Sequence, residues 1–168
     1  MSGRIFLLGD DIDTDQLAPG QYMKGGLNML AAHCLESARP DFAGSAKPGD
    51  VIVAGRNFGM GSSREQAAEA LKHLGLAGVV ARSFAGIFYR NALNLGLPVL
   101  VADDISGVDD GDAANLDPVA GELKLTNKNR TVRLEPLPDN LKPMLADGGL
   151  VPHLKKRFAA ERAKEAGA

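Results

Sequence analysis

Residues 59–66, Gly-Met-Gly-Ser-Ser-Arg-Glu-Gln, combine side chains that could bind an anion. They follow an apolar run and precede a segment of helical composition, which predicts a strand, a glycine turn and the start of a helix. Glycines let the backbone approach a ligand closely, and the free N–H groups and dipole of a helix start favour negative charge. The hydroxyl groups of Ser62 and Ser63 and the planar guanidinium of Arg64 are donors that suit a carboxylate. The segment therefore predicts a carboxylate or phosphate site.

The same serines also have a purely structural interpretation. Ser62 with Glu65, and Ser63 with Gln66, match the capping box, in which both side chains satisfy the first N–H groups of a helix. Capping is a common use of serine at a helix start. The segment is not a Walker loop, because no Gly-Lys-Ser/Thr follows its glycines, and it lacks the dinucleotide-binding spacing. Spacing alone leaves both interpretations open.

An acidic loop near the N-terminus contains Asp10, Asp11, Asp13 and Asp15. It does not match an EF-hand, which needs a glycine at its sixth position and a glutamate at its twelfth. Aspartates in such loops usually close turns or cap helices. The alternative is that one or two of them hold the serine loop or face a partner.

Other common catalytic arrangements find no support in the sequence. His33, His73 and His153 are far apart and lack the spacing of metal ligands. Cys34 is the only cysteine, so no disulfide and no cysteine-bound cluster can form within the chain. The Gly-x-Ser-x-Gly elbow of serine hydrolases does not occur. The serine loop is therefore the strongest candidate site.

Short apolar runs alternate with helical segments over much of the chain. The predicted strands are residues 5–8, 51–54, 79–81 and 97–101, and the predicted helices are residues 27–37, 64–74 and 87–95. This alternation predicts crossover units and an α/β fold. The later part predicts a β-hairpin of residues 121–126 and 130–135, then helices over residues 140–146 and 152–164. No domain boundary is visible, so we expect one domain, residues 1–168, with a helical tail from about residue 150.

Composition and charge exclude several classes of partner. The chain has 168 residues, 45% of them hydrophobic, and a net charge of −2. Nucleic acids and anionic membranes need a concentrated basic patch, and the basic residues of the C-terminal stretch alternate with Glu161 and Glu165 as on a solvated helix face. The sequence has neither a signal peptide nor an apolar run that could span a membrane. We therefore expect a cytoplasmic protein.

Three motifs, in order and at matching spacing, resemble the swivelling domain of the aconitase superfamily. They are residues 13–15 (Asp-Thr-Asp), residues 59–67 (Gly-x-Gly-Ser-Ser-Arg-Glu-Gln-Ala) and residues 83–87 (Ser-Phe-Ala-x-Ile). The chain is most similar to the free-standing small subunits of isopropylmalate isomerases, over about residues 4–150. The resemblance implies an α/β fold of the layered β/β/α type.

The resemblance also implies a two-subunit hydro-lyase of leucine biosynthesis, which interconverts 2-isopropylmalate and 3-isopropylmalate by dehydration and rehydration. Its large subunit carries a 4Fe–4S cluster, so this chain holds no cofactor and is inactive without that partner. By the same resemblance Ser62 is the catalytic base, and Ser63 and Arg64 bind a carboxylate of the small hydroxy-acid substrate. The supporting residues are Asp13, Thr14, Asp15, Gly59 and Gly61. Self-association of the isolated chain is left open.

Substrate choice in these relatives depends on a loop that corresponds here to residues 21–26. Tyr22, Met23 and Lys24 are the candidate contacts. Isopropylmalate-specific relatives carry an apolar residue there and homoaconitase-type relatives an arginine, whereas Lys24 departs from both. Met23 could line an apolar pocket, and Lys24 could pair with a distal carboxylate or face solvent.

Three alternatives to isopropylmalate isomerisation stay open. One is the small subunit of a homoaconitase or of a methylmalate-type dehydratase. The second is a non-catalytic module that binds a carboxylate or phosphate, and the third is a purely structural scaffold.

Overall fold

The computed structural model describes residues 2–167, which contain a seven-stranded sheet in the order β4-β3-β2-β1-β5-β6-β7. One half is parallel and consists of β1 (Gly3–Leu7), β2 (Val51–Ala54), β3 (Gly78–Ala81) and β4 (Val99–Val101). Every residue of β2 and β3 is buried, as expected for parallel strands that are covered on both faces. The four strands predicted from the apolar runs are all present.

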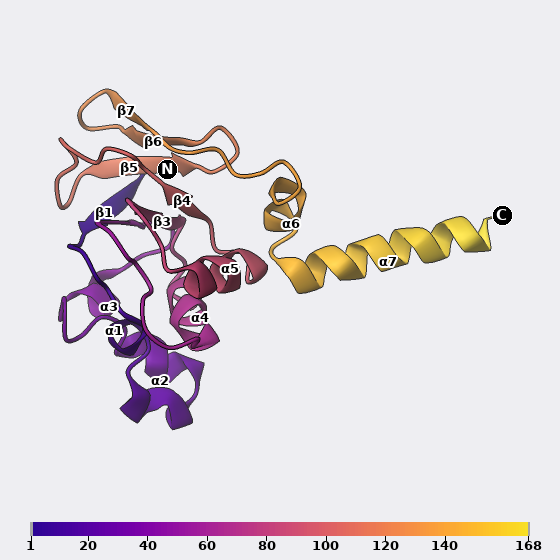
Figure 1. The fold of residues 1–168 in the computed structure, drawn as a ribbon, viewed down its shortest axis with the longest axis horizontal. Coiled ribbons are helices and arrows are strands. Elements are labelled where there is room, and N and C mark those ends of the chain that lie inside the picture. Colours follow the sequence, from indigo (N-terminus) through magenta and orange to yellow (C-terminus); the bar gives the residue numbers. More distant parts are fainter. Residues whose placement is uncertain (1, 168) are drawn as a thin grey trace.

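The other half of the sheet is antiparallel and consists of β5 (Ala113–Asp117), β6 (Glu122–Leu125) and β7 (Arg130–Arg133). The β6–β7 pair confirms the predicted hairpin. β5 joins the two halves by pairing antiparallel with the start of β1, and Figure 1 shows this half lying across one end of the molecule. β5 was not predicted, because Ala-Ala-Asn-Leu-Asp has none of the β-branched residues that mark strands.

Two helices cross over between the parallel strands. α4 (Glu65–His73) connects β2 to β3, and α5 (Gly86–Asn94) connects β3 to β4. Both predicted helices are confirmed within a residue or two. α4 buries Ala67, Ala68, Ala70 and Leu71 on its inward face, and its close neighbours are α1, α2 and α5.

Short helical turns fill the connection from β1 to β2. They are α1 (Thr14–Leu17), the 3₁₀ helix η1 (Gly20–Gly25), α2 (Leu27–Ala32) and α3 (Phe42–Ser45). The helix expected over residues 27–37 ends at Ala32 instead. Leu35 adopts a left-handed conformation, with φ of 63°, and its N–H donates to the carbonyl oxygen of Gln16 at 2.7 Å. This long-range hydrogen bond replaces the helical one that local composition favours.

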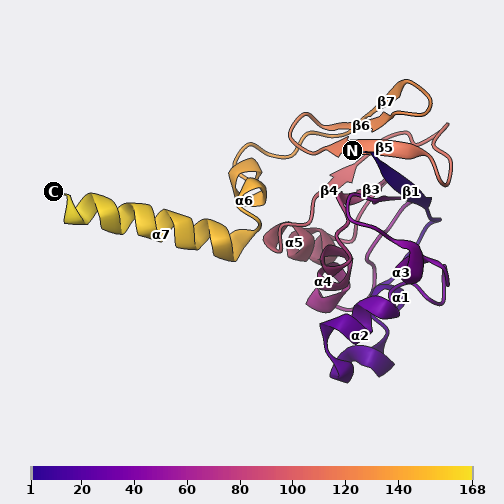
Figure 2. The same cartoon turned by 180° about the vertical axis from the view of Figure 1, so that it is seen from behind.

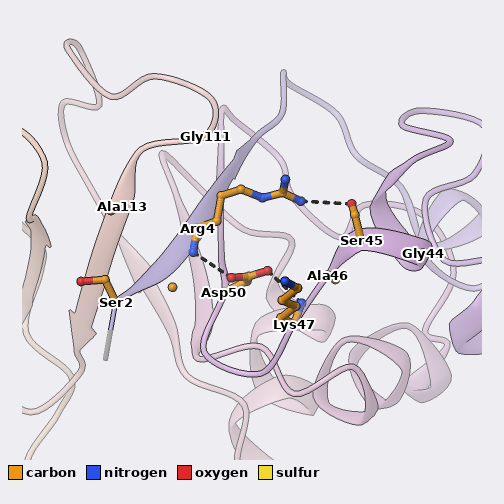
Figure 3. A pocket seen from close by; sticks show the side chains of 10 residues that line it. Ser2, Arg4, Gly44, Ser45, Ala46, Lys47, Asp50, Gly111 and Ala113 are labelled. Atoms are coloured by element: carbon orange, nitrogen blue, oxygen red, sulfur yellow. Dashed lines mark hydrogen bonds between the residues drawn. The ribbon is translucent and has the colours of Figure 1, made fainter.

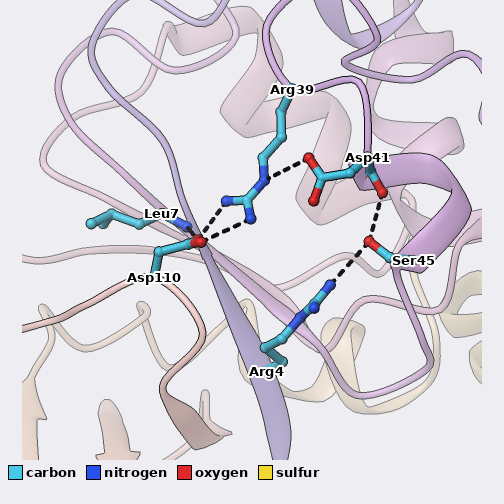
Figure 4. A network of polar contacts seen from close by, with 6 residues as sticks. All are labelled: Arg4, Leu7, Arg39, Asp41, Ser45 and Asp110. Carbon is cyan, nitrogen blue, oxygen red and sulfur yellow. Dashed lines mark hydrogen bonds and ion pairs between the residues drawn. The ribbon is translucent and has the colours of Figure 1, made fainter.

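A polar network holds the end of β1 (Figure 4). The carboxylate of Asp110 accepts hydrogen bonds from the backbone N–H of Leu7, at 2.9 Å, and from two nitrogens of Arg39. The hydrogen bond from Arg39 holds the pKa of Asp110 below its usual range. Phe6, the residue before Leu7, packs its ring edge-on against Phe42, with 4.8 Å between the ring centroids. The guanidinium of Arg39 lies over the Phe6 ring. These contacts therefore fix the backbone position at which β1 ends and the acidic loop begins.

A second polar network holds the antiparallel half to β1. Asp112 is buried, and its carboxylate accepts hydrogen bonds from Asn127 at 2.9 Å and from the N–H of Asp109 at 2.8 Å. Lys128 forms an ion pair with the same carboxylate at 2.8 Å. These contacts lower the pKa of Asp112 to about 2, so it stays ionised at neutral pH. The turn between β6 and β7 is thus tied to the strand beside β1.

The chain ends in α6 (Lys142–Ala146) and α7 (Leu150–Ala166), and α7 projects away from the sheet (Figures 1 and 2). No residue of α7 is buried, and Arg157 pairs with Glu161 at 3.4 Å, as expected for a solvated helix face. Among the described residues, no helix is both long and apolar enough to cross a membrane.

Candidate functional site

The three motifs meet at one edge of the parallel sheet. β1, β2 and β3 run side by side in the same direction, so the loops that follow them leave from the same edge. Two isolated parallel bridges join these loops, Asp13 to Met60 and Phe58 to Phe84. The loop after β2 therefore lies between the loop after β1 and the loop after β3.

Backbone hydrogen bonds fix the serine loop on both sides. The N–H of Gly59 donates to the carbonyl of Ile12 at 2.7 Å, and the N–H of Thr14 donates to the carbonyl of Met60 at 2.9 Å. On the other side, Phe58 donates to Ser83 at 3.1 Å and accepts from Ala85 at 2.9 Å. A loop with this many partners presents its side chains in a defined place.

Two glycines in the loop are required by its conformation and packing. Gly59 has φ of 85°, and a Cβ on it would lie 2.2 Å from the ring of Phe88. Gly61 has φ of 105°, and a Cβ on it would lie 3.1 Å from the Thr14 hydroxyl. Side chains rarely adopt such φ values, so only glycine allows the loop to lie this close to its neighbours.

Ser62 lies on an exposed part of this loop and contacts Thr14, which is 2% exposed. The two hydroxyl oxygens are 3.1 Å apart, and the N–H of Ser62 also donates to the Thr14 hydroxyl oxygen at 3.1 Å. The serine is therefore held from the acidic loop through both its backbone and its side chain. Its outward side stays open.

The capping-box interpretation of the serines is wrong. α4 begins only at Glu65, and its N-cap is Arg64, with no side-chain cap. Ser62 and Ser63 are exposed and precede the helix, and their hydroxyl groups do not cap its N-terminus. Within residues 2–167, the N–H groups of Ser63 and Arg64 donate to no other group of the protein. These N–H groups are available to bind an anion.

The aspartates of the acidic loop hold the site together. Asp13 caps α1 in a capping box with Gln16, through hydrogen bonds of 2.8 and 2.9 Å. Asp10 accepts from the N–H of Arg56 at 2.7 Å, and Asp11 from the Asn57 amide at 3.2 Å. Both interpretations of the loop are thus correct for different residues. Asp13 caps a helix, and Asp10 and Asp11 hold the residues that precede the serine loop.

The Arg64 side chain extends toward α1 and the residue that follows it. Its Nη1 forms an ion pair with Asp15 and donates to the carbonyl of Ala18 at 3.2 Å. Both contacts use Nη1, so within residues 2–167 the Nη2 and Nε donors carry no hydrogen bond to protein. A guanidinium oriented in this way can still bind a carboxylate.

The predicted specificity loop lies in η1, beside these residues. The Tyr22 ring stacks on His33, with 3.6 Å between centroids, and His33 in turn bonds to Glu36 at 2.6 Å. Met23 is half-buried and Lys24 is exposed. In the part of the chain that the structure describes, no hydrogen bond or ion pair joins residues 22–24 to the serine loop.

Sequence reasoning missed several contacts that build the site. The Asp13–Gln16 capping box has its own sequence signature, an Asp followed three residues later by a Gln, and could have been found. Ser83 accepts a hydrogen bond from the N–H of Asn57 at 2.8 Å, and Asn57 has a left-handed φ of 60°. No short sequence pattern predicts the contact between Asn57 and Ser83, because it forms only when β2 and β3 lie side by side.

The site lies apart from one cavity of the protein, and the described residues contain no cluster of metal-binding side chains. Among residues 2–167, no group of three or more His, Cys, Asp or Glu side chains could hold a metal ion. A cavity of about 550 Å³ lies at the opposite end of β1 and is lined by Arg4, Ser45, Lys47 and Asp50, among others (Figure 3). The Asp50 carboxylate there is occupied by the N–H groups of Arg4 and Lys47, at 2.7 and 2.8 Å, and closes a turn.

Comparison with known proteins supports the resemblance. A model of the aconitase C-terminal domain family matches residues 35–104, which include the serine loop. The 3-isopropylmalate dehydratase small subunit 2 of Archaeoglobus fulgidus is 49% identical, over 93% of this chain and 95% of that protein.

The chain belongs to the 3-isopropylmalate dehydratase small-subunit family. The methanogen homoaconitase small subunit of Methanothermobacter thermautotrophicus is 48% identical, over 92% of this chain and 90% of that protein. A crystal structure of 3-isopropylmalate dehydratase from Methanocaldococcus jannaschii superposes with a TM-score of 0.91 at 45% identity, and covers 97% of this chain and 98% of that one. These matches confirm the α/β swivelling-domain fold predicted from the motifs.

Replacing Gly59 tests how tightly the loop is built. Gly59→Ala should lower the free energy of unfolding by about 1–2 kcal/mol for the left-handed backbone and by about 1–3 kcal/mol more for displacing Phe88. Gly26→Ala is the matched control, because Gly26 has φ of 87° but nothing within 4 Å of the added Cβ. Urea unfolding of both variants measures the difference. Equal losses would contradict the close packing of Gly59 on Phe88.

Proposed function

We propose that this chain is the small subunit of a two-subunit hydro-lyase that interconverts 2-isopropylmalate and 3-isopropylmalate. The observation that carries the proposal is that exposed Ser62 and partly buried Arg64 lie together, each in contact with a residue of the Asp-Thr-Asp motif. The site is an open face and not an enclosed pocket, so it needs a partner surface to exclude water and complete it. Relatives 48% and 49% identical to this chain are named as small subunits.

In this proposal Ser62 is the base. Its oxygen, as the anion, takes the proton from the carbon beside a carboxylate, the electron pair of that C–H bond forms the C=C bond, and the hydroxyl group on the neighbouring carbon leaves as hydroxide. Hydroxide then adds to the carbon that lost the proton, and Ser62 returns the proton to the carbon that lost the hydroxyl group, which regenerates the serine anion. A serine hydroxyl is a weak base, so its anion needs preorganised donors around it.

Arg64 and Ser63 bind a substrate carboxylate in this proposal. The free Nη2 and Nε of Arg64 provide a planar pair of donors, and the ion pair with Asp15 orients them. The unpaired N–H of Ser63 lies next to them. Fixing the carboxylate fixes the direction of the adjacent C–H bond relative to Ser62.

An iron–sulfur cluster of the family type does not fit this chain. Such a cluster needs several cysteine thiolates, whereas the chain has one cysteine. Cys34 is fully buried, and burial raises the pKa of its thiol, so it stays protonated. In this proposal the cluster therefore belongs to the large subunit. The cytoplasmic location of the protein also stays a prediction from the sequence.

A second candidate is the small subunit of a homoaconitase. It is favoured by the cationic Lys24 in the proposed specificity loop and by the 48% identity to a methanogen homoaconitase small subunit. Met23, half-buried beside it, favours the apolar side chain of isopropylmalate instead. The two candidates share the base and the carboxylate clamp and differ only at the far end of the substrate.

Mixing the two subunits tests the proposed activity. This chain and its iron–sulfur large subunit, reconstituted without oxygen, should together turn over isopropylmalate, and neither should do so alone. The ultraviolet absorbance of the unsaturated acid measures the dehydration. Stable association of the two chains without turnover of isopropylmalate, homocitrate, citrate or methylmalate would contradict the proposal and favour a non-catalytic carboxylate-binding module.

Lys24 separates the two substrates. Lys24→Ala should change KM for isopropylmalate little, because that acid has no third carboxylate. For homocitrate, loss of a charged partner should raise KM about tenfold or more, and Lys24→Arg should restore it. KM measured with both acids for the three proteins decides the matter. A large effect of Lys24→Ala on homocitrate turnover, with poor turnover of isopropylmalate, would assign the homoaconitase reaction.

A further inference from the structure

We infer that Thr14 is a positioning residue that donates its hydroxyl proton to Ser62 Oγ and thereby stabilises the serine anion. The inference rests on the proposed function, in which Ser62 is the base. This role is separate from the structural one, in which the Thr14 oxygen accepts the Ser62 N–H and supports the loop. Three features of the contact carry it: the direction of the hydrogen bond, the burial of Thr14 and the rigidity of its surroundings.

The direction follows from the hydrogen bonds around the threonine. The N–H of Ser62 donates to Thr14 Oγ1 at 3.1 Å, so one lone pair of the threonine oxygen is already used. A hydroxyl group has a single proton. Within residues 2–167, Ser62 Oγ, at 3.1 Å, is the only hydrogen-bonding partner of the threonine hydroxyl besides that N–H. The proton of Thr14 is therefore directed at Ser62 Oγ.

Burial makes this direction costly to reverse. Thr14 is 2% exposed, so its proton has no access to bulk water, and leaving it without an acceptor would cost free energy. Ser62, in contrast, is exposed and can turn its own proton outward. The proton that must leave Ser62 before it can act as a base is thus on the side away from the protein.

The threonine cannot easily move away when the charge on Ser62 changes. Its N–H donates to Met60 at 2.9 Å, its carbonyl accepts from Ala18 at 2.8 Å, and it follows the Asp13 cap directly as the first residue of α1. Gly61 lies so close that a Cβ there would be 3.1 Å from Oγ1. A donor held in this way needs no reorganisation when the serine anion forms.

Thr14 gains and loses no proton in the reaction. When Ser62 is an anion, the hydrogen bond from Thr14 is charge-assisted and strong. When Ser62 takes the proton from the substrate carbon, the same bond becomes an ordinary hydrogen bond between two hydroxyl groups. The threonine therefore lowers the energy of the basic form selectively, which is how it would affect the rate rather than substrate binding.

The test compares Thr14→Val and Thr14→Ser in the enzyme assembled with its large subunit. Valine keeps the shape but removes both the donor to Ser62 Oγ and the acceptor of the Ser62 N–H, and serine restores both. Thr14→Val should lower kcat about a hundredfold or more, as for loss of one donor to an oxyanion, with KM changed far less. It should also move the acidic limb of the pH–rate profile to higher pH, because a less stabilised anion forms only at higher pH. Thr14→Ser should return both to near their original values.

Two controls keep this test separate from the proposed function. Retained activity in Ser62→Ala would overturn the proposed function itself. An inactive Ser62→Ala combined with normal kcat and pH profile in Thr14→Val, or with a Thr14→Ser that fails to recover, would overturn only the inference. Thermal unfolding and subunit association measured for each variant establish that it is folded. If Thr14→Val does not fold, Thr14→Ala removes the same donor without added bulk and carries the same expectations.

Discussion

The parallel pairing of β1, β2 and β3 is the constraint on which the site depends. It sends three loops, distant in sequence, away from the same edge of the sheet, and the bridges Asp13–Met60 and Phe58–Phe84 then join them. The serine loop is the middle of the three and is held on both sides. The network of Arg39 and Asp110 holds the backbone at the end of β1, where the first of these loops begins.

The site itself is divided between support and exposure. Thr14 and Asp15 come from one loop and contact Ser62 and Arg64, which come from the next. Thr14 is buried, whereas Ser62 and Asp15 are exposed. This arrangement fits the proposal that the chain supplies positioned groups to a reaction completed by a second chain.

Much of this could be predicted from the sequence, and the failures have identifiable causes. The apolar runs at residues 51–54 and 79–81 and the glycine-ended helices were found because their signals are local. β5 was missed, since its pairing with β1 and not its composition makes it a strand. The helix beyond Ala32 was overextended because the bond from Leu35 to Gln16 is long-range. The serines matched a capping box locally, yet the bridge to Asp13 and the hydrogen bond to Thr14 draw them out of the helix. The catalytic role of Ser62 and the substrate-binding roles of Ser63, Arg64, Tyr22, Met23 and Lys24 stay predictions.

The central claim is that this chain supplies the base to a site shared with its large subunit. The most direct measurement is the rate of dehydration by the assembled enzyme with Ser62→Ala, with Ser37→Ala as the control at an exposed serine outside the site. We predict that Ser62→Ala associates with the partner and binds substrate, but loses at least about a hundredfold in kcat, as expected for removal of a general base. The control should keep full activity. Dehydration by Ser62→Ala at the rate of the unmodified enzyme would contradict the account.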